Sequence, residues 1–248
     1  MPARRIATVD TAHQQIEVWK SSHACEFRVA GAIHAWWHRS QFLTGLAWDN
    51  LAAASLLRPA GPPRSLLMLG LAGGTTLRIL RHLLPDCRFA AVDIDPEVVE
   101  LARQHMHLDD TGVTVHIADA YEWFKRDRRR YDVIIDDCYL AGAEDVYRPQ
   151  TRPGRDLDRL AKLLNPGGIF LTNLVTGSGH RRMQSRTRAA FKRRFANVRT
   201  VTTPESMNET LVGGDSVLPG GALDAWTERF RSQKDRKYWE ILSVRKLK

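Results

Sequence analysis

The stretch LLMLGLAGGTTLRIL, residues 66–80, decides the fold of this chain. It begins with an unbroken apolar run, passes through a turn with three glycines and continues with apolar residues at helical spacing. This order predicts a buried strand, a tight turn and the start of a helix. Glycines in such a turn let the backbone come close to a ligand. The stretch is therefore a candidate binding loop.

The alternation of strand-like and helix-like segments continues along the chain. We expect seven strands, at residues 66–69, 89–92, 113–117, 132–135, 168–173, 198–201 and 239–244. Helices are expected at residues 75–84, 96–105, 121–125, 155–164 and 181–195. Strands that alternate with helices form a parallel sheet with helices on both faces. The predicted fold class is α/β: a Rossmann-like, doubly wound and mostly parallel seven-stranded sheet.

The first 50 residues follow a different pattern. Short alternating stretches surround VAGA, residues 29–32, and indicate β-hairpins rather than strand–helix–strand units. The segment TGLAWDNLAAASLL, residues 44–57, is typical of a helix. We therefore expect a small N-terminal β region over residues 1–50 and a Rossmann-like, ligand-binding domain over residues 51–248.

The composition narrows the class of protein. The chain has 248 residues, 43% of them hydrophobic, which is enough for one sizeable core. Its apolar runs are far shorter than the ~20 residues of a membrane helix, and its first residues lack the apolar centre of a secretory signal. The three cysteines are scattered without a CxxC pair, which is typical of a reducing compartment and predicts no metal site. We expect a cytoplasmic protein with no membrane partner.

The chain is basic. Lysine and arginine outnumber aspartate and glutamate by 37 to 28, and the surplus gathers at residues 125–130 and 180–195. Such a surplus permits an anionic partner. Residues 181–195 also fit a helix with its arginines on the solvated face, which is the interpretation we favour. No nucleic-acid module accompanies the charge, so we do not expect a nucleic-acid partner.

Acidic residues end the strands that follow the glycine turn. Asp93 ends the second predicted strand and Asp119 ends the third. Asp93 can accept hydrogen bonds from both ribose hydroxyls of an adenosine, and Asp119 can accept one from the exocyclic amine of adenine. Asp136 and Asp137 follow the fourth strand, whereas Asp95, at a helix start, is interpreted as an N-cap. Ligands bind at this carboxyl edge, so the pattern indicates an adenosine-containing cofactor.

Five stretches carry a resemblance to a known family. They are LGLAGGTTLR, AVDIDPEVVELAR, HIADAYEWF, YDVIIDD and LNPGGIFLTNL, and together they resemble the S-adenosylmethionine-dependent methyltransferase superfamily. The apolar Met68, at a position where a general methyltransferase usually has an acid, favours the spermidine synthase branch. The resemblance implies S-adenosylmethionine or its decarboxylated form as the cofactor and a small molecule as the acceptor. A homodimer is one arrangement that it allows.

The resemblance also implies which residues bind. Contacts to the cofactor are expected at the glycine turn and the strand ends, from Gly70, Ala72, Gly73, Asp93, Ile94, Asp119, Ala120, Asp136 and Asp137. VAGAIH places His34, and WDNL places Trp48 and Asp49, near positions at which this branch contacts its substrate. Tyr147 is a further candidate at the mouth of the site. For His34, a surface or packing role is the interpretation that we favour over a substrate contact.

The chain departs from the branch at its catalytic acids. Aminopropyltransferases have two acids after the fourth strand, and the second takes the proton and helps to bind the amine. Here the first acid is Asp137, but the second falls on Leu140. Glu144 or Asp145 can substitute for it, and Tyr139 is another candidate base.

This departure favours one reaction without excluding the others. We expect methyl transfer from S-adenosylmethionine to a small molecule. The alternative is aminopropyl transfer from the decarboxylated cofactor to a polyamine. Aminocarboxypropyl transfer, an internal displacement on the cofactor and a non-catalytic module that binds the cofactor or nucleic acid also stay open, because one scaffold hosts many chemistries.

Overall fold

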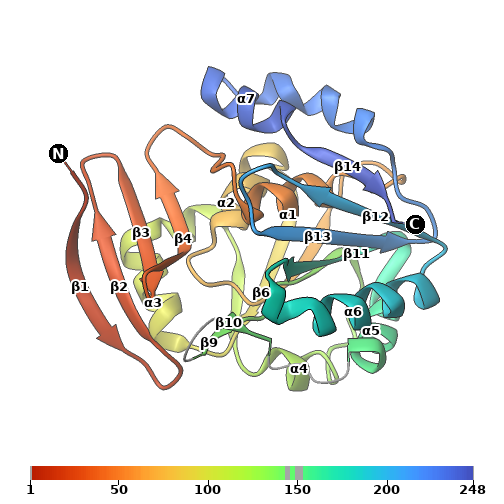
Figure 1. Cartoon of the computed structure of the whole chain (residues 1–248), viewed down its shortest axis with the longest axis horizontal. Coiled ribbons are helices and arrows are strands. Elements are labelled where there is room, and N and C mark those ends of the chain that lie inside the picture. The colour runs from red at the N-terminus through yellow and green to blue at the C-terminus, as the bar shows by residue number, and fades with distance from the viewer. Residues whose placement is uncertain (1, 143–145, 149–152, 248) are drawn as a thin grey trace.

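The computed structural model describes residues 2–142, 146–148 and 153–247 (Figure 1). A large sheet forms the centre of the molecule. Its eight described strands lie in the order β14 (Ser243–Lys246), β12 (Asn197–Thr202), β13 (Asn208–Gly214), β11 (Leu164–Val175), β8 (Tyr131–Asp136), β5 (Ser65–Leu69), β6 (Arg88–Asp93) and β7 (Thr114–Ile117). From β11 to β7 the neighbours are parallel, and from β14 to β11 they are antiparallel.

The predicted fold class is confirmed, but the number of strands was wrong. The sheet has eight described strands rather than seven, because β13 was not predicted. The last predicted strand, residues 239–244, spans the end of a helix, α7 (Gln233–Glu240), and the start of β14. β13 pairs with β11 on one side and with β12 on the other, so it lies inside the antiparallel part of the sheet.

Helices cover both faces of the sheet, as the doubly wound fold requires. Side chains of β5 alternate between two cores: Leu66 and Met68 belong to one, Leu67 and Leu69 to the other. The first core packs against α1 (Ala47–Ser55), α2 (Thr75–Leu83), α3 (Pro96–Met106) and α7. The second packs against α4 (Ala120–Trp123), α5 (Pro153–Ala161) and α6 (Arg181–Arg194). Short 3₁₀ turns occupy Leu108–Thr111, Ser178–His180 and Gly220–Arg229.

A second, smaller sheet precedes the large one. Strands β1 (Arg4–Asp10), β2 (Gln15–Lys20), β3 (Ala24–Val29) and β4 (Ala32–His38) form an antiparallel meander, at the left of Figure 1. The hydroxyl of Thr75, at the start of α2, accepts from the backbone N–H of Trp36 at 2.8 Å and donates to its carbonyl at 3.0 Å. This reciprocal pair attaches β4 to the helix that follows the glycine turn.

Two buried aspartates hold the linker between the two sheets, residues 39–46, which joins β4 to α1. Asp235 on α7 accepts from the backbone N–H groups of Phe42 (3.1 Å) and Leu43 (2.9 Å). Asp49 on α1 accepts from those of Thr44 (3.0 Å) and Gly45 (2.6 Å). Carboxylates that accept several backbone donors fix the linker, because leaving such N–H groups unpaired in the interior costs free energy. A short hairpin, β9 (Leu140–Ala141) with β10 (Val146–Tyr147), follows β8.

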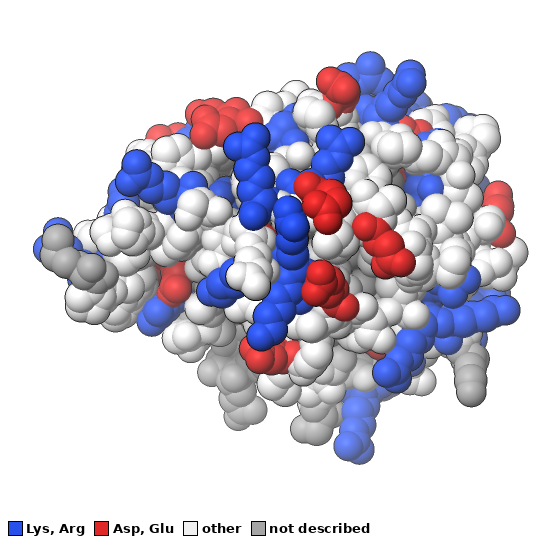
Figure 2. Space-filling view, turned by 90° about the horizontal axis from the view of Figure 1, so that it is seen from above, with Lys and Arg blue, Asp and Glu red and all other residues white. Residues whose placement is uncertain are grey.

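Basic side chains are exposed on the surface of the molecule, and α6 carries several of them. Acidic side chains lie among the basic ones on the face seen in Figure 2. On α6 the buried residues are Thr187, Ala190 and Phe191, and Arg188 pairs with Glu209, which agrees with a helix whose basic side chains face outward. Among the described helices, none combines the length and the apolar composition needed to cross a bilayer.

Candidate active site

A cavity of ≈ 360 Å³ lies between the two sheets. The large sheet contributes the glycine turn after β5 and the ends of β6, β7 and β8, and the small sheet contributes residues of β2, β3 and β4. From β5 the chain runs outward to β6 and β7 and then returns to the other side of β5 as β8. Ligands of open α/β sheets bind at such a topological switch point. The small sheet forms the roof of the cavity.

The glycines of the turn have different roles. Gly70 has a φ of +80°, and a Cβ there would lie 2.5 Å from the carbonyl oxygen of Asp137, so only glycine fits. Gly70 and Ala72 line the cavity, as expected. Gly73 does not line it: its Cα faces the small sheet, where a Cβ would lie 2.4 Å from that of Ala35. The structure therefore gives Gly73 a packing role in place of the expected cofactor contact.

Asp93 holds the glycine turn in place. Its Oδ2 accepts from the backbone N–H groups of Leu71 (2.7 Å) and Ala72 (3.0 Å), and its Oδ1 from that of Asp95 (3.0 Å). Burial raises the pKa of this carboxyl, against the effect of these donors. A carboxylate offers about four lone-pair positions. Three backbone N–H groups therefore hold Asp93 in place, and the side chain still lines the cavity, where the ribose contacts expected of it stay a prediction.

Two further acids at this edge, Asp95 and Asp119, cap helices. Asp95 accepts from the N–H of Val98 (3.2 Å) at the start of α3 and from the hydroxyl of Thr11 (2.7 Å), which ties the roof to this helix. Its interpretation as an N-cap is confirmed. Asp119 caps α4 through Oδ1, which accepts from the N–H of Tyr121 at 2.7 Å. Ile94 and Ala120, also expected at the cofactor, line the cavity beside these acids, and Asp119 stands exposed at its mouth.

Asp136 lies outside the cavity, in contrast to its expected cofactor contact. Its Oδ2 is 2.6 Å from Nη1 of Arg148, and both side chains are buried. Nη2 of Arg148 also donates to the carbonyl oxygen of Asn173, at 2.7 Å, on β11. Asp136 therefore belongs to a buried ion pair that anchors the chain after β10 against the sheet.

Asp137 is the acid at the centre of the site. It lines the cavity, and its Oδ1 accepts from Nδ2 of Asn173 at 2.8 Å. The side chain of Asn173 is held in turn by Nδ2 of Asn208, which donates to its Oδ1 at 3.1 Å. Burial raises the pKa of Asp137 to about 7, against the lowering effects of Asn173 and of the charge of Arg148. A carboxylate poised near neutral pH suits a general base.

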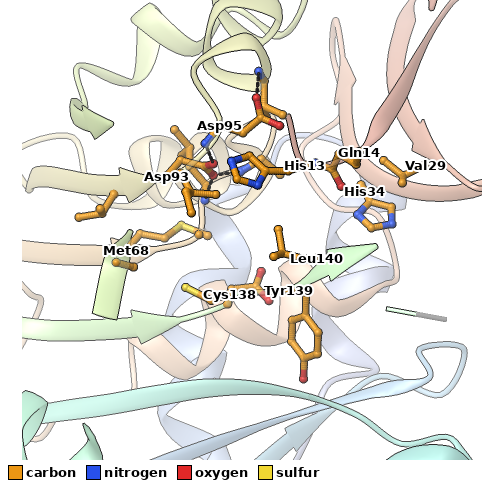
Figure 3. Close-up of a pocket in the computed structure, with 18 of the residues that line it drawn as sticks. His13, Gln14, Val29, His34, Met68, Asp93, Asp95, Cys138, Tyr139 and Leu140 are labelled. Carbon is orange, nitrogen blue, oxygen red and sulfur yellow. Dashed lines mark hydrogen bonds between the residues drawn. The ribbon is translucent and has the colours of Figure 1, made fainter. Parts of the chain in front are cut away.

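The remaining catalytic candidates are placed differently. The hydroxyl of Tyr139 donates to the carbonyl of Asn173 at 3.0 Å and points away from His13 and Asp93 (Figure 3), so it does not face the cavity as a base. Leu140 lines the cavity where the branch has its second acid. Glu144 and Asp145, the proposed substitutes, lie outside the described residues.

Of the expected substrate contacts, His34 and Trp48 line the cavity. Burial lowers the pKa of His34. Asp49 does not line it, because its carboxylate is used by the linker at Thr44 and Gly45. Half-exposed Tyr147 lies on β10, beside a different hollow.

Two residues of the roof were missed by the sequence analysis. His13 and Gln14, from the turn between β1 and β2, line the cavity (Figure 3). Oε1 of Gln14 and the hydroxyl of Thr76 are buried there without a hydrogen-bond partner among the described residues. The amine and hydroxyls of an adenosine would satisfy such orphaned acceptors. In the sequence, the only signal for these two residues is that they are a polar pair directly before a stretch that alternates like a strand.

Comparisons with known proteins agree with this geometry. A family model described as "Methyltransferase domain" matches residues 66–239. A probable polyamine aminopropyl transferase of Bifidobacterium longum is 28% identical over 173 residues, 68% of this chain and 37% of that protein. A polyamine aminopropyltransferase of Chromobacterium violaceum is 33% identical over 138 residues, 55% of this chain and 49% of that protein.

The fold has solved counterparts as well. A probable spermidine synthase of Corynebacterium glutamicum has a TM-score of 0.72 at 20% identity, covering 90% of this chain and 86% of that one. The matched region spans half or less of the two curated relatives. The family model, by contrast, covers most of the chain, including the glycine turn and the strand ends of the large sheet that form the cavity. The chain therefore belongs to the methyltransferase-domain family, as a member with the spermidine synthase-like fold.

Proposed function

We propose that this chain transfers an aminopropyl group from decarboxylated S-adenosylmethionine to an amine. One observation carries the proposal: four carboxylates line the cavity, and the described lining residues include neither lysine nor arginine. These acids are Asp93, Asp95, Asp119 and Asp137. The decarboxylated cofactor carries a sulfonium and an ammonium group and no carboxylate, so it matches an acidic cavity without a cation.

The names of the curated relatives support the same reaction, since both are polyamine aminopropyl transferases. The positive net charge of the chain does not argue against the binding of a cationic cofactor and amine. Local carboxylates set the field inside a cavity, whereas the surface charge is screened by salt over about 10 Å.

We assign Asp137 as the general base that takes the proton of the acceptor amine. When bound, the cofactor supplies a carbon on a positively charged sulfur: the amine nitrogen forms the C–N bond, the C–S electron pair stays on the sulfur of 5′-methylthioadenosine, and nitrogen loses a proton. Oδ1 of Asp137 is held by Asn173, which fixes the carboxylate and leaves Oδ2 for that proton. Gly70 lets the backbone at Asp137 approach the glycine turn closely.

Methyl transfer is a second candidate, and Leu140 favours it. An apolar side chain stands where the aminopropyltransferase pattern has its second acid, so the acceptor amine loses one partner. Ring N–H groups of His13 and His34, which line the cavity, would donate to the carboxylate of intact S-adenosylmethionine.

The co-product separates the two candidates. The purified chain is incubated with each form of the cofactor and a panel of primary amines, and the nucleoside released is identified by mass spectrometry. We expect 5′-methylthioadenosine from the decarboxylated form only. Release of S-adenosylhomocysteine from the intact form would contradict the proposal and establish a methyltransferase.

A matched pair of variants assigns the product to this site. Asp137→Asn removes the base and should slow the release by about 10²- to 10⁴-fold. Asp215→Asn, at an exposed aspartate that does not line the cavity, should leave it unchanged.

A further inference from the structure

A second hollow, of ≈ 560 Å³, adjoins the cofactor cavity. It is lined by the hairpin strand β10, by Arg148, by the end of β11 and by the start of α6. Tyr139 lines both spaces, so the two are neighbours at this residue. Figure 3 shows the ring of Tyr139 below Leu140, with its hydroxyl directed away from the roof.

The second hollow has the opposite chemistry to the cavity. Its described lining includes Arg148 and no carboxylate, whereas four carboxylates line the cavity. Apolar side chains, among them Leu174, Val175 and Met183, form much of the remaining wall. An ammonium group in the second hollow would lose its hydration without gaining a counter-ion, so its binding there is unfavourable.

Arg148 also leaves one donor unused. Its Nη1 donates to Asp136 and its Nη2 to the carbonyl oxygen of Asn173, but its Nε is buried without a partner among the described residues. The side chain of Arg148 is 2% exposed. A buried N–H requires an acceptor, and an ammonium group has only donors. An oxygen atom of a ligand would satisfy this group.

The hollow lies where the far end of an acceptor would fall. Asn173 links the two spaces: its Nδ2 donates to Asp137 in the cavity, and its carbonyl accepts from Tyr139 and Arg148 at the hollow. A short amine with its nitrogen at Asp137 and its chain past Tyr139 would bring its other end toward Arg148.

We propose that the acceptor is an amine whose far end carries an oxygen, as a hydroxyl or a carboxylate, and that the second hollow holds this end. This inference rests on the proposed function for the reaction at Asp137. The far end takes no part in the transfer, so the atoms and electrons balance as described above. A diamine, with ammonium at both ends, is then the poorer acceptor.

The test compares three amines of equal length: 4-aminobutan-1-ol, 4-aminobutanoate and 1,4-diaminobutane. Their binding to the full chain, in the presence of 5′-methylthioadenosine, is measured by calorimetry. We expect at least one of the oxygen-ended amines to bind at least 10-fold more tightly than the diamine, and the better of the two identifies the preferred oxygen group. Equal or tighter binding of the diamine, or binding of none of the three, overturns the proposal.

Turnover is followed separately, as release of 5′-methylthioadenosine from the decarboxylated cofactor. Selective binding without release would refute the aminopropyl reaction but support the hollow. Release that is fastest with the diamine would support the reaction and refute the hollow.

A pair of variants on α6 locates the binding. Met183→Trp places a large ring in the hollow and should weaken the oxygen-ended amine at least 10-fold, with the affinity for the decarboxylated cofactor unchanged. Ser185→Trp, on the exposed face of the same helix and outside the hollow, is the control and should bind like the parent chain. Thermal unfolding confirms that both variants fold. An unchanged affinity in Met183→Trp contradicts the assignment.

Discussion

The two halves of the cavity edge are built by different means. At the ends of β6 and β7, the acids Asp93, Asp95 and Asp119 bind backbone N–H groups close to them in sequence or in the glycine turn. At the ends of β8 and β11, Asp137 and Asn173 bind each other through their side chains. The first half therefore fixes the shape of the backbone, and the second places individual functional groups.

This difference predicts how each half responds to substitution. Changes in the half held by backbone contacts should affect stability more than the chemical step. Changes in the half held by side chains should affect the chemical step more than stability. The four predictions below test this division, from the largest effect to the smallest.

Asp137→Asn should have the largest effect. It keeps the shape of the side chain and removes the base, so kcat should fall by about 10²- to 10⁴-fold, the usual contribution of general base catalysis. The melting temperature and the cofactor affinity should change little. Steady-state kinetics and calorimetry measure these quantities, and a variant that keeps most of its kcat would show that another group takes the proton.

The pH dependence sharpens the role of Asn173. The base must be ionised, and burial raises the pKa of Asp137 to about 7, so the rate should rise with pH through a midpoint near 7. Asn173→Ala removes a hydrogen bond to the charged form, typically worth about 1.5–3 kcal/mol, and should move the midpoint upward by about one to two pH units. A pH–rate profile tests this, and an unmoved midpoint would mean that Asn173 does not tune the base.

Gly70→Ala tests the half held by backbone contacts. The new Cβ would meet the carbonyl oxygen of Asp137, and the φ of +80° is unfavourable for alanine. Together these should lower the free energy of unfolding by about 1–3 kcal/mol, as backbone strain does elsewhere. Gly61→Ala is a matched control, since Gly61 has a φ of +81° and nothing within 4 Å of its Cβ position. Equal losses in urea titrations of the two variants would rule out the close approach as a cause.

Thr11→Val should have the smallest effect. It removes the hydroxyl that donates to Asp95 and joins the roof to α3. The same hydroxyl also accepts from the backbone N–H groups of His13 and Gln14, so the loss in stability should be about 1–2 kcal/mol, at about 0.5–1.5 kcal/mol for each net hydrogen bond. Thr11→Ser keeps the hydroxyl and should restore most of it. A kcat that falls more than the stability explains would contradict the division between the two halves.

From the sequence we could predict the parallel strands and one cap in the half of the site that local contacts build. The five parallel strands follow from short apolar runs, and Asp95 could be recognised as an N-cap because its partner Val98 lies three residues ahead. The antiparallel strand β13, NETLVGG, was missed, since its polar and glycine residues hide the apolar pattern. There Glu209 is buried because Arg188 of α6 pairs with it, a contact that no local pattern contains.

The other half depends on residues far apart in the chain. Asn173 reaches Asp137 from 36 positions away, and Arg148 reaches Asp136 from 12. Gly73 gave the same signal as Gly70, but its neighbour is Ala35 in the other sheet. Tertiary packing decides these roles, so a motif marks the right strand end without telling which side chain faces the ligand.

The bond between Asp235 and the linker sets an order for folding during synthesis. The N–H groups of Phe42 and Leu43 receive their carboxylate from a residue near the other end of the chain. At about 5–20 residues per second, a ribosome needs roughly 10–40 s to travel from one to the other. The large sheet can form most of its parallel part within that interval, while the linker still lacks the acceptor that fixes it. The linker at Phe42 and Leu43 therefore lacks this acceptor until Asp235 has been made, whereas the roof can bind Thr75 of α2 and Asp95 at the start of α3 well before then.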